Sequence, residues 1–368
     1  MRQGRSERGT WREHGPRPLA RCPPLHGWYT PRHSGGDGLN SDTGGVESER
    51  LTIAVTGATG FVGRAVVRAL AERGHSVRTL VRDMDKARDA LGDLDYTPVK
   101  GDIFNADAVG RLCDGCNGVI HLIGIRREGP ARKGVTFRRM HVEATGRILE
   151  AAKQAGARRY IHMSALGARP LTRSRYHQTK YEAEQLVRSS GLGWTIFQPS
   201  IIHGPDGEFM QMAAGWVRGE EQPKYFLPYF FTVDPDTGET RAGRVQIVSV
   251  EDVAGVFVDA LSVDEAIGEV YPIGGPEAMD WPSLLTTIRD HVPGANPKLK
   301  PRGISGDFAS YMAQAAGIVG LGQLLPFGPD EPLMAMEDST CSLARAEAHL
   351  GYRPREFVEE LSGYARRI

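Results

Sequence analysis

The sequence predicts a doubly wound α/β fold, in which a parallel sheet carries helices on both faces. From residue 51 onward, strand-like apolar segments alternate with helix-like amphipathic ones, which is typical of sheets built from strand–helix–strand units. The segment 118–124 is apolar on both faces, as a central parallel strand should be. With 368 residues, the chain is long enough for one large α/β domain or two smaller ones.

Composition narrows the classes of partner. The chain has 45 Lys and Arg against 45 Asp and Glu, so its net charge gives no general attraction to nucleic acid and none is expected as a partner. Four cysteines fit a reducing cytosol, and we expect a cytoplasmic protein. Cys113 and Cys116 precede a strand and have no second ligand pair. They therefore predict reduced thiols and no metal site.

Residues 1–50 differ from the rest of the chain. They contain seven arginines before position 33, many glycines and prolines, and little apolar periodicity. We interpret them as a disordered leader. A basic tail that binds nucleic acid or acidic lipid is the alternative.

A glycine turn follows the first strand, residues 51–55, and precedes the first helix. Gly57 allows a tight turn, Gly60 lets the backbone approach a pyrophosphate, and Gly63 lets the helix pack close to the strand. The helix N-terminus supplies free N–H donors. The turn therefore predicts a dinucleotide site. Its expected members are Gly57, Thr59, Gly60, Phe61, Val62, Gly63 and Arg64.

The end of the second strand, residues 75–83, indicates which dinucleotide is preferred. An NAD-specific site usually has an acid here for the ribose, but this sequence has Val81 followed by Arg82. Arg82 and Arg64 would pair with a 2′-phosphate, so NADP(H) is favoured. NAD(H) is the alternative, because Asp83 could hold a ribose hydroxyl instead.

The next two strands add further candidates for the cofactor site. The short strand near 96–103 ends in Asp102 and Ile103. Asp102 would accept from the adenine amino group or would cap the helix that starts near Asn105. Leu122 and Gly124 end the central strand 118–124. A helix over about 141–154 and a fifth strand over 160–165 follow.

Tyr176 and Lys180 are the candidate catalytic pair. They lie four residues apart in a predicted helix and so project from one face. A neighbouring lysine stabilises a phenolate, and we expect Lys180 to lower the pKa of Tyr176. The phenol would then act as a general acid or base on a carbonyl/alcohol pair. Ser164, at the end of the fifth strand, is the third candidate.

These motifs together resemble the short-chain dehydrogenase/reductase superfamily, over about residues 51–290. The longer glycine spacing and the Tyr-x-x-x-Lys pair fit it, as do 197–205 and 245–254, which look like elements of its extended or atypical members. The resemblance implies that Lys180 also holds the nicotinamide ribose. It places the backbone of Pro199, Ser200 and Ile202 beside the nicotinamide.

Within that superfamily, residues 160–164 and 174–176 look closest to the accessory subunit of respiratory complex I and its bacterial relatives, known as NAD-dependent epimerase/dehydratase proteins. That subunit is regarded as binding NADPH without catalysis. Active members place Ser or Thr at a slot that is Ala165 here, and strand alternation turns Ser164 to the other face unless a bulge intervenes. Losing one such donor costs about two to three powers of ten in rate.

Residues 51–203 are thus predicted to form the NAD(P)-binding Rossmann domain, and 204–368 a mixed substrate or partner region, of which part of 240–275 returns to the main sheet. In that region the aromatic and apolar run 225–231 suggests a strand covered on both faces, with a substrate or partner as one of the covers. A hairpin packed on its own small domain is the alternative. Residues 236–238 suggest a hairpin turn. The stretch 308–327 has no charged residue. It predicts either helices over the substrate cleft or a surface that docks on a membrane or membrane complex.

The sequence predicts a cofactor-binding protein with weak or no oxidoreductase activity. Its role would be structural or sensory, stabilised by the nucleotide and linked to respiration or a membrane complex, with a peripheral membrane location as a second option. The alternative is an active NADPH-dependent oxidoreductase, or a sugar-nucleotide epimerase or dehydratase, that uses Tyr176 and Lys180.

Overall fold

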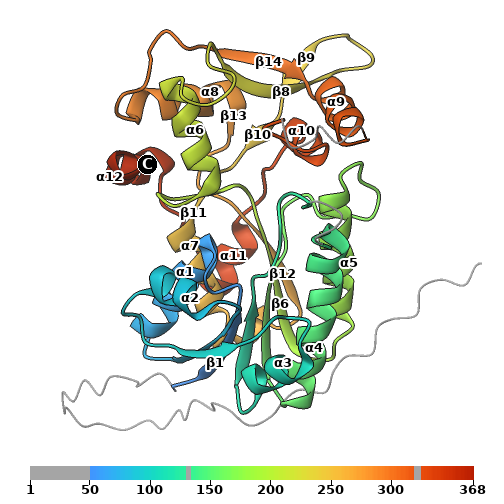
Figure 1. Ribbon diagram of the computed structural model, residues 1–368, viewed down its shortest axis with the longest axis vertical. Coiled ribbons are helices and arrows are strands. Elements are labelled where there is room, and N and C mark those ends of the chain that lie inside the picture. The colour runs from blue at the N-terminus through green and yellow to red at the C-terminus, as the bar shows by residue number, and fades with distance from the viewer. Residues whose placement is uncertain (1–49, 130–133, 319–324) are drawn as a thin grey trace, which may run out of the picture. The chain divides into compact units, whose positions relative to one another are not determined.

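The structure is a computed structural model that describes residues 50–129, 134–318 and 325–368 (Figure 1). The interpretation of residues 1–50 as a leader therefore falls, apart from Arg50, outside the described residues. Residues 319–324 of the uncharged stretch also fall outside them.

Seven parallel strands form the central sheet, in the order β12-β6-β5-β4-β1-β2-β3. This confirms the predicted fold class. The strands are β1 (Thr52–Thr56), β2 (Ser76–Val81), β3 (Thr97–Lys100), β4 (Gly118–His121), β5 (Arg159–Met163), β6 (Gly193–Pro199) and β12 (Glu269–Ile273). The strand order reverses at β1, which lies between β2 and β4. Ligands of doubly wound sheets bind where the order reverses, outside the carboxyl ends of the strands.

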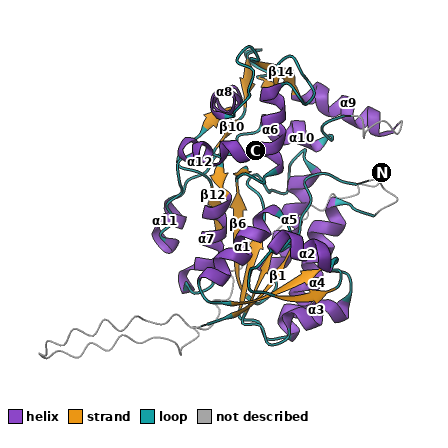
Figure 2. Ribbon diagram, turned by 60° about the vertical axis from the view of Figure 1, so that its left-hand side comes forward, coloured by secondary structure: helices purple, strands orange, loops and turns teal. Residues whose placement is uncertain are grey.

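Helices cover both faces of this sheet (Figures 1 and 2). Successive strand residues belong to different cores: Ile53 and Ile161 pack in one, Ala54 and Tyr160 in the other. Because side chains alternate across a strand, both faces must be apolar to be buried. The first core includes residues of α1 (Phe61–Glu72), α2 (Met84–Leu91), α7 (Val250–Asp259) and α11 (Ala344–Leu350). The second includes residues of α3 (Ala106–Cys113), α4 (Ala144–Gln154) and α5 (Arg175–Arg188), with the π-helical turn η2 (Arg138–Glu143) before α4.

The rest of the chain builds a smaller region around a third core. Residues of α6 (Glu208–Arg218), α8 (Trp281–His291) and α12 (Phe357–Tyr364) pack together there. The other elements are β7 (Ile202–His203), β8 (Leu227–Val233), β9 (Thr240–Ala242), β10 (Arg244–Val245), β11 (Val248–Ser249), η3 (Asp264–Ala266), β13 (Met279–Asp280), β14 (Pro301–Ser305), α9 (Gly306–Ile318), α10 (Asp330–Met336) and η5 (Ala365–Arg367).

The hairpin predicted near residue 236 is present between β8 and β9, which pair antiparallel. Its turn is held by Asp234, whose carboxylate accepts from the backbone N–H groups of Asp236 and Thr237. The described residues cover the run 225–231 only in part, and β8 packs in a small sheet of its own, as the alternative interpretation of this run expects. Tyr225 is 88% exposed, and in β8 only Leu227 is buried, because the strand lies in a small three-stranded sheet.

Two further sequence expectations concern the thiols and the uncharged stretch. Cys113 and Cys116 are free and buried, as expected for reduced thiols. Burial raises the pKa of the Cys113 thiol to about 12, so it stays protonated and unreactive. Among the described residues, no helix is long and apolar enough to cross a membrane.

We expect Gly63→Ala to destabilise the protein by about 1–3 kcal/mol, because the new Cβ would lie 2.1 Å from the carbonyl oxygen of Gly57, a backbone atom with little room to move. Gly110→Ala is the matched control. Gly110 is also helical but has nothing within 4 Å of its Cβ position, so this change should stabilise by about 0.5–1 kcal/mol. Urea unfolding of both variants checks this, and equal effects would contradict it.

Candidate functional site

The glycine turn after β1 has the geometry of a phosphate cradle. Gly57 has φ +78°, and a Cβ there would lie 3.1 Å from the carbonyl carbon of Leu122. A Cβ on Gly60 would lie 3.2 Å from the Gly57 oxygen. Helix α1 begins at Phe61 with no side-chain cap. The first N–H groups of any helix have no intrahelical partner, and here no side chain caps them. They are available to an anion, so the residues fit a dinucleotide pyrophosphate.

The three side chains considered for the adenosine ribose have different roles in the structure. Asp83 caps α2, and one of its oxygens accepts from the N–H groups of Asp85 at 3.1 Å and Lys86 at 3.2 Å. Arg64 pairs with Asp206 at 3.3 Å. Arg82 is exposed, and its side chain has no hydrogen bond or ion pair within the described residues. Arg82 is therefore the side chain left free for a 2′-phosphate.

The adenine end of the predicted site lies after β3. Asp102 accepts from the backbone N–H of Phe104 at 2.9 Å. Asn105, not Asp102, caps α3, through a bond from the Ala108 N–H. The capping alternative for Asp102 is therefore wrong, because the first helical turn already has its cap. Ile103 is buried nearby.

In the segment after β6, the Ser200 side chain is turned to the C-terminal region. Pro199 ends β6 and Ile202 begins β7. Between them, the Ser200 hydroxyl is buried and lies 2.9 Å from both the carbonyl and the hydroxyl oxygens of Ser339. That side chain is therefore committed to a contact with the C-terminal region.

Tyr176 and Lys180 come together on α5, close to the end of β4. The Lys180 Nζ donates to the Met163 carbonyl at 3.1 Å and lies 5.9 Å from the centre of the Tyr176 ring. Gly124 leaves room for this amine, because a Cβ there would be 3.0 Å from Nζ. Burial lowers the pKa of Lys180 to about 8, with Glu184 opposing the shift.

The Tyr176 phenol differs from its expected state. Burial raises its pKa to about 12, against an opposing effect from the Arg126 charge. The expectation of a lowered phenol pKa is therefore wrong for this structure, because desolvation of the phenolate is the largest effect. The hydroxyl has no hydrogen-bond partner among the described residues. Tyr176 is thus a protonated donor that is free to bond a ligand.

Ser164 is held away from such a role. Its hydroxyl donates to a carboxylate oxygen of Glu184 at 2.5 Å, and the same oxygen accepts from the Gln198 side chain at 2.7 Å. Glu184 is almost completely buried, so these bonds compensate for its lost hydration. Ala165, which follows, is also buried and brings no donor.

Sequence reasoning missed His141 as part of the site. It lies in the π-helical turn η2, and its ring packs edge-on against Tyr176 with centroids 5.4 Å apart. Its Nδ1 is 2.9 Å from the Thr179 hydroxyl. Burial lowers the pKa of His141 to about 2, so the imidazole is neutral. The available signal was a histidine on an apolar helix face, which does not by itself indicate a role beside a phenol.

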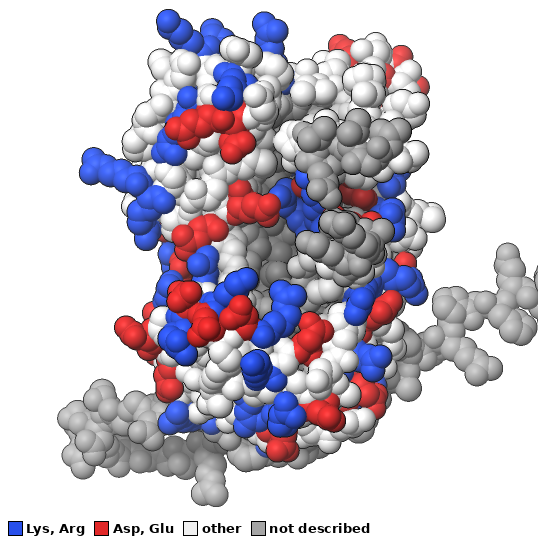
Figure 3. Space-filling view, in the orientation of Figure 1, with Lys and Arg blue, Asp and Glu red and all other residues white. Residues whose placement is uncertain are grey.

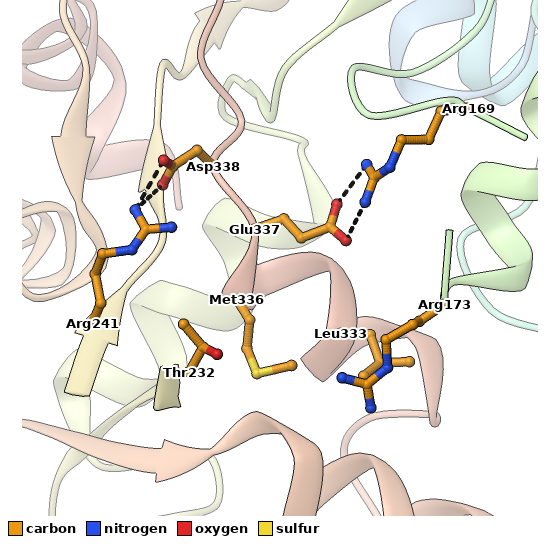
Figure 4. Close-up of a pocket in the computed structure, with 8 residues that line it drawn as sticks. All are labelled: Arg169, Arg173, Thr232, Arg241, Leu333, Met336, Glu337 and Asp338. Atoms are coloured by element: carbon orange, nitrogen blue, oxygen red, sulfur yellow. Dashed lines mark hydrogen bonds and ion pairs between the residues drawn. The ribbon is translucent and has the colours of Figure 1, made fainter. Parts of the chain in front are cut away.

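A cavity of about 450 Å³ lies between the loop after β5 and the C-terminal region (Figure 4). Arg169 pairs with Glu337 at 2.6 and 2.8 Å, and Arg241 with Asp338 at 2.9 Å to both oxygens. Arg173 also lines the cavity and pairs with Asp307 of α9 at 2.7 Å. Leu333 and Met336 add apolar surface.

Comparisons with known proteins indicate the family of this chain. Residues 57–218 match a family of NAD(P)H-binding domains. The chain is 32% identical over 258 residues to a ceramide reductase of Caulobacter vibrioides, covering 68% of this chain and 73% of that one. It is 28% identical over 273 residues to the NADH dehydrogenase (ubiquinone) 1 alpha subcomplex subunit 9 of Dictyostelium discoideum, covering 73% and 71%. The crystal structure of gox2253 superposes with a TM-score of 0.65 at 26% identity, covering 85% of this chain and 96% of the other.

We expect Lys180→Met to raise the free energy of unfolding at pH 7. The buried amine has a pKa of about 8 against an ordinary 10.5, which sets an upper limit of about 3 kcal/mol on the gain. Between those values the folded protein loses the proton before the unfolded chain does, so wild-type stability rises with pH and the gap closes by about pH 10.5.

Denaturant unfolding at several pH values measures this difference. The exposed Lys153→Met, on the neighbouring helix α4, is the control and should show no such trend. A gain for Lys180→Met that stays constant between pH 7 and 10.5 would show that the buried charge is not its source.

Proposed function

This chain belongs to the short-chain dehydrogenase/reductase superfamily, among atypical members related to the complex I accessory subunit, and from that premise we propose an NAD(P)H-holding protein with slow carbonyl chemistry. The bound nucleotide would serve mainly to stabilise the fold or to report the redox state of the cofactor pool. The proposal is supported by residues 57–218, which are similar to NAD(P)H-binding domains.

We expect the nucleotide to be held by free hydrogen-bonding groups and by glycines that let the backbone approach it closely. The α1 N-terminus and its glycines would bind the pyrophosphate, Asp102 the adenine, and Lys180 the nicotinamide ribose. A reduced nicotinamide would supply hydride. Tyr176 would donate a proton to the substrate oxygen, and Lys180 would steady the phenolate left behind.

One observation carries the proposal of slow chemistry. The Ser164 hydroxyl donates to Glu184, and Ala165 follows it without a donor. The developing charge on a substrate oxygen would then be stabilised by Tyr176 alone among the expected donors. Absence of a second donor is worth about two to three powers of ten in rate. A structural or sensory role is also consistent with the likeness to a complex I subunit, which would make a respiratory or membrane complex the partner.

A second candidate is an active reductase, which a specific observation favours. The Tyr176 hydroxyl has no partner within the described residues, beside a lysine whose pKa is about 8. The relative from Caulobacter vibrioides is named a ceramide reductase, so carbonyl groups of lipids belong in any substrate panel. Both candidates use the same cofactor and differ in turnover.

We expect slow or absent NADPH oxidation with ketones, quinones, lipid carbonyl compounds and nucleotide sugars. Tyr176→Phe should leave NADPH binding unchanged, because the hydroxyl contributes no described contact. Ala165→Ser should raise any residual rate by about tenfold or more by adding a donor to the substrate oxygen. Absorbance at the reduced nicotinamide band follows the reaction.

Ala168→Ser, in the same loop, is the control for Ala165→Ser and should not change the rate. Fast wild-type turnover that is abolished in Tyr176→Phe would reject the slow-chemistry proposal and select the active reductase. Absence of nucleotide binding by the wild-type protein would reject both.

We further propose that the chain prefers NADPH to NADH, because Arg82 is free to pair with a 2′-phosphate. Arg82→Ala should weaken NADPH binding by about tenfold or more and leave NADH binding nearly unchanged. Calorimetric titration of both nucleotides measures this, with the NADH affinity of the same variant as internal control. Equal wild-type affinities for the two nucleotides would contradict the preference.

A further inference from the structure

Two opposite charges are buried one turn apart on α5. Lys180 and Glu184 are 3% and 1% exposed, which makes them the most buried cation and the most buried carboxylate among the described residues. Figure 3 shows many Lys, Arg, Asp and Glu side chains on the surface, the usual place of such groups. Residues four apart in a helix lie on the same face. A buried charge is costly unless it is paired, so each of the two side chains needs compensation close by.

The end of β5 holds both side chains. The Lys180 Nζ donates to the carbonyl of Met163 at 3.1 Å. The hydroxyl of Ser164, the next residue of the chain, donates to the Glu184 carboxylate at 2.5 Å. Two consecutive residues at the end of the strand therefore bind two successive turns of the helix. This double attachment fixes the height of the Lys180 amine relative to the sheet.

The Glu184 carboxylate has only donors as partners. The oxygen that accepts from Ser164 also accepts from the Gln198 side chain at 2.7 Å. The other oxygen lies 3.5 Å from the guanidinium of Arg188, whose side chain is 39% exposed. An ionised carboxylate can only accept hydrogen bonds, so this set of partners suits the charged form. The Arg188 contact is long and lies at the solvent edge, which leaves Lys180 as the buried cation nearest along the helix.

The other titratable groups around the Lys180 amine bring no negative charge. They are three histidines from neighbouring elements, His121 of β4, His141 of η2 and His162 of β5. Burial lowers the pKa of each histidine, and the Lys180 charge lowers it further, so all three are neutral. The Tyr176 phenol is protonated as well.

Glu184 acts on Lys180 through space. In the part of the chain that the structure describes, no direct ion pair joins the two side chains, since the amine is bonded to Met163 and the carboxylate to Ser164. The negative charge of Glu184 nevertheless raises the pKa of Lys180 and so opposes the lowering by burial. Charges interact strongly across a poorly hydrated interior.

We propose that Glu184 is a positioning residue for Lys180: its buried carboxylate keeps the amine charged and, through Ser164, holds the Lys180 turn of α5 against the end of β5. An ammonium group has three donors. Met163 takes one of them, so the charged amine keeps two for ribose hydroxyls. This inference deepens the proposed function and rests on it, because Lys180 is the residue proposed to hold the nicotinamide ribose.

Titration of the Lys180 amine by NMR tests the proposal on the full chain without nucleotide. In protein labelled with carbon-13 at the lysine Cε, the signal that is absent in Lys180→Met belongs to Lys180. We expect a wild-type midpoint near pH 8. In Glu184→Gln the midpoint should fall by about one unit or more, because a close opposite charge shifts a pKa by about one to three units. The amide oxygen of the new side chain can still accept from Ser164 and Gln198.

Glu182→Gln is the matched control, because it removes the same charge from the same helix. Glu182 pairs with Arg138 at 2.7 Å near the surface, so the Lys180 midpoint should stay unchanged. Glu184→Asp keeps the charge and should restore most of the wild-type midpoint.

NADPH binding gives a second readout. If only the charged amine binds the ribose, a midpoint lowered by about one unit from about 8 makes Glu184→Gln bind about fivefold more weakly than wild type at pH 8. At pH 6 both amines are charged and the two affinities should be equal. A structural defect alone would weaken binding at both pH values.

An unchanged Lys180 midpoint in folded Glu184→Gln, or an equal shift in Glu182→Gln, would overturn the proposal. If Glu184→Gln does not fold, Lys180→Met/Glu184→Gln should fold, because removal of the amine also removes the need for a counter-charge. Failure of this double variant to fold would overturn the proposal in favour of a purely structural role for Glu184. Absence of NADPH binding by the wild type at every pH would reject the proposed function, while the NMR titration would still decide whether Glu184 keeps Lys180 charged.

Discussion

The close contact between the glycine turn and the first turn of α1 is the constraint on which the rest of the site depends. Gly63 approaches the Gly57 carbonyl so closely that no Cβ fits between them. This contact holds α1 against β1. The residue before the helix is Gly60, so the helix N-terminus has no side-chain cap. Because β1 is also the strand at which the sheet order reverses, the same few backbone atoms determine where a dinucleotide would enter and how it would lie along the carboxyl ends of β4 and β5.

Around Tyr176, burial rather than charge pairing sets the protonation states. The phenol is kept protonated, His141 is kept neutral, and the Lys180 amine is brought within reach of physiological pH, with desolvation the first cause in each case. A buried cation that is destabilising on its own is characteristic of a site selected for binding or chemistry. The Lys180 amine on α5 donates to the Met163 carbonyl at the end of β5, so these two elements position the amine together.

The fold followed from the sequence because its signals were local: an apolar strand, a glycine turn and amphipathic helices in register with a parallel sheet. The pairing of Tyr176 with Lys180 was equally predictable, since it needs only helical spacing. The contacts of His141, Arg64 and Ser200 could not be predicted, because each depends on a partner that is distant in the sequence. The phenol pKa was misjudged for the same reason: burial is a property of the packed site, which the sequence pattern does not give.

The cavity in Figure 4 is lined by arginines that already pair with carboxylates. Arg169, Arg173 and Arg241 each have a carboxylate partner, in Glu337, Asp307 and Asp338. An anionic ligand would have to displace these carboxylates from the arginines or share the arginines with them. Its binding would therefore exchange one ion partner for another and would not simply neutralise free charge. Released carboxylates of Glu337 and Asp307 would loosen the loop after β5 from α9 and α10. Occupancy of the cavity and the attachment of that loop would therefore be coupled.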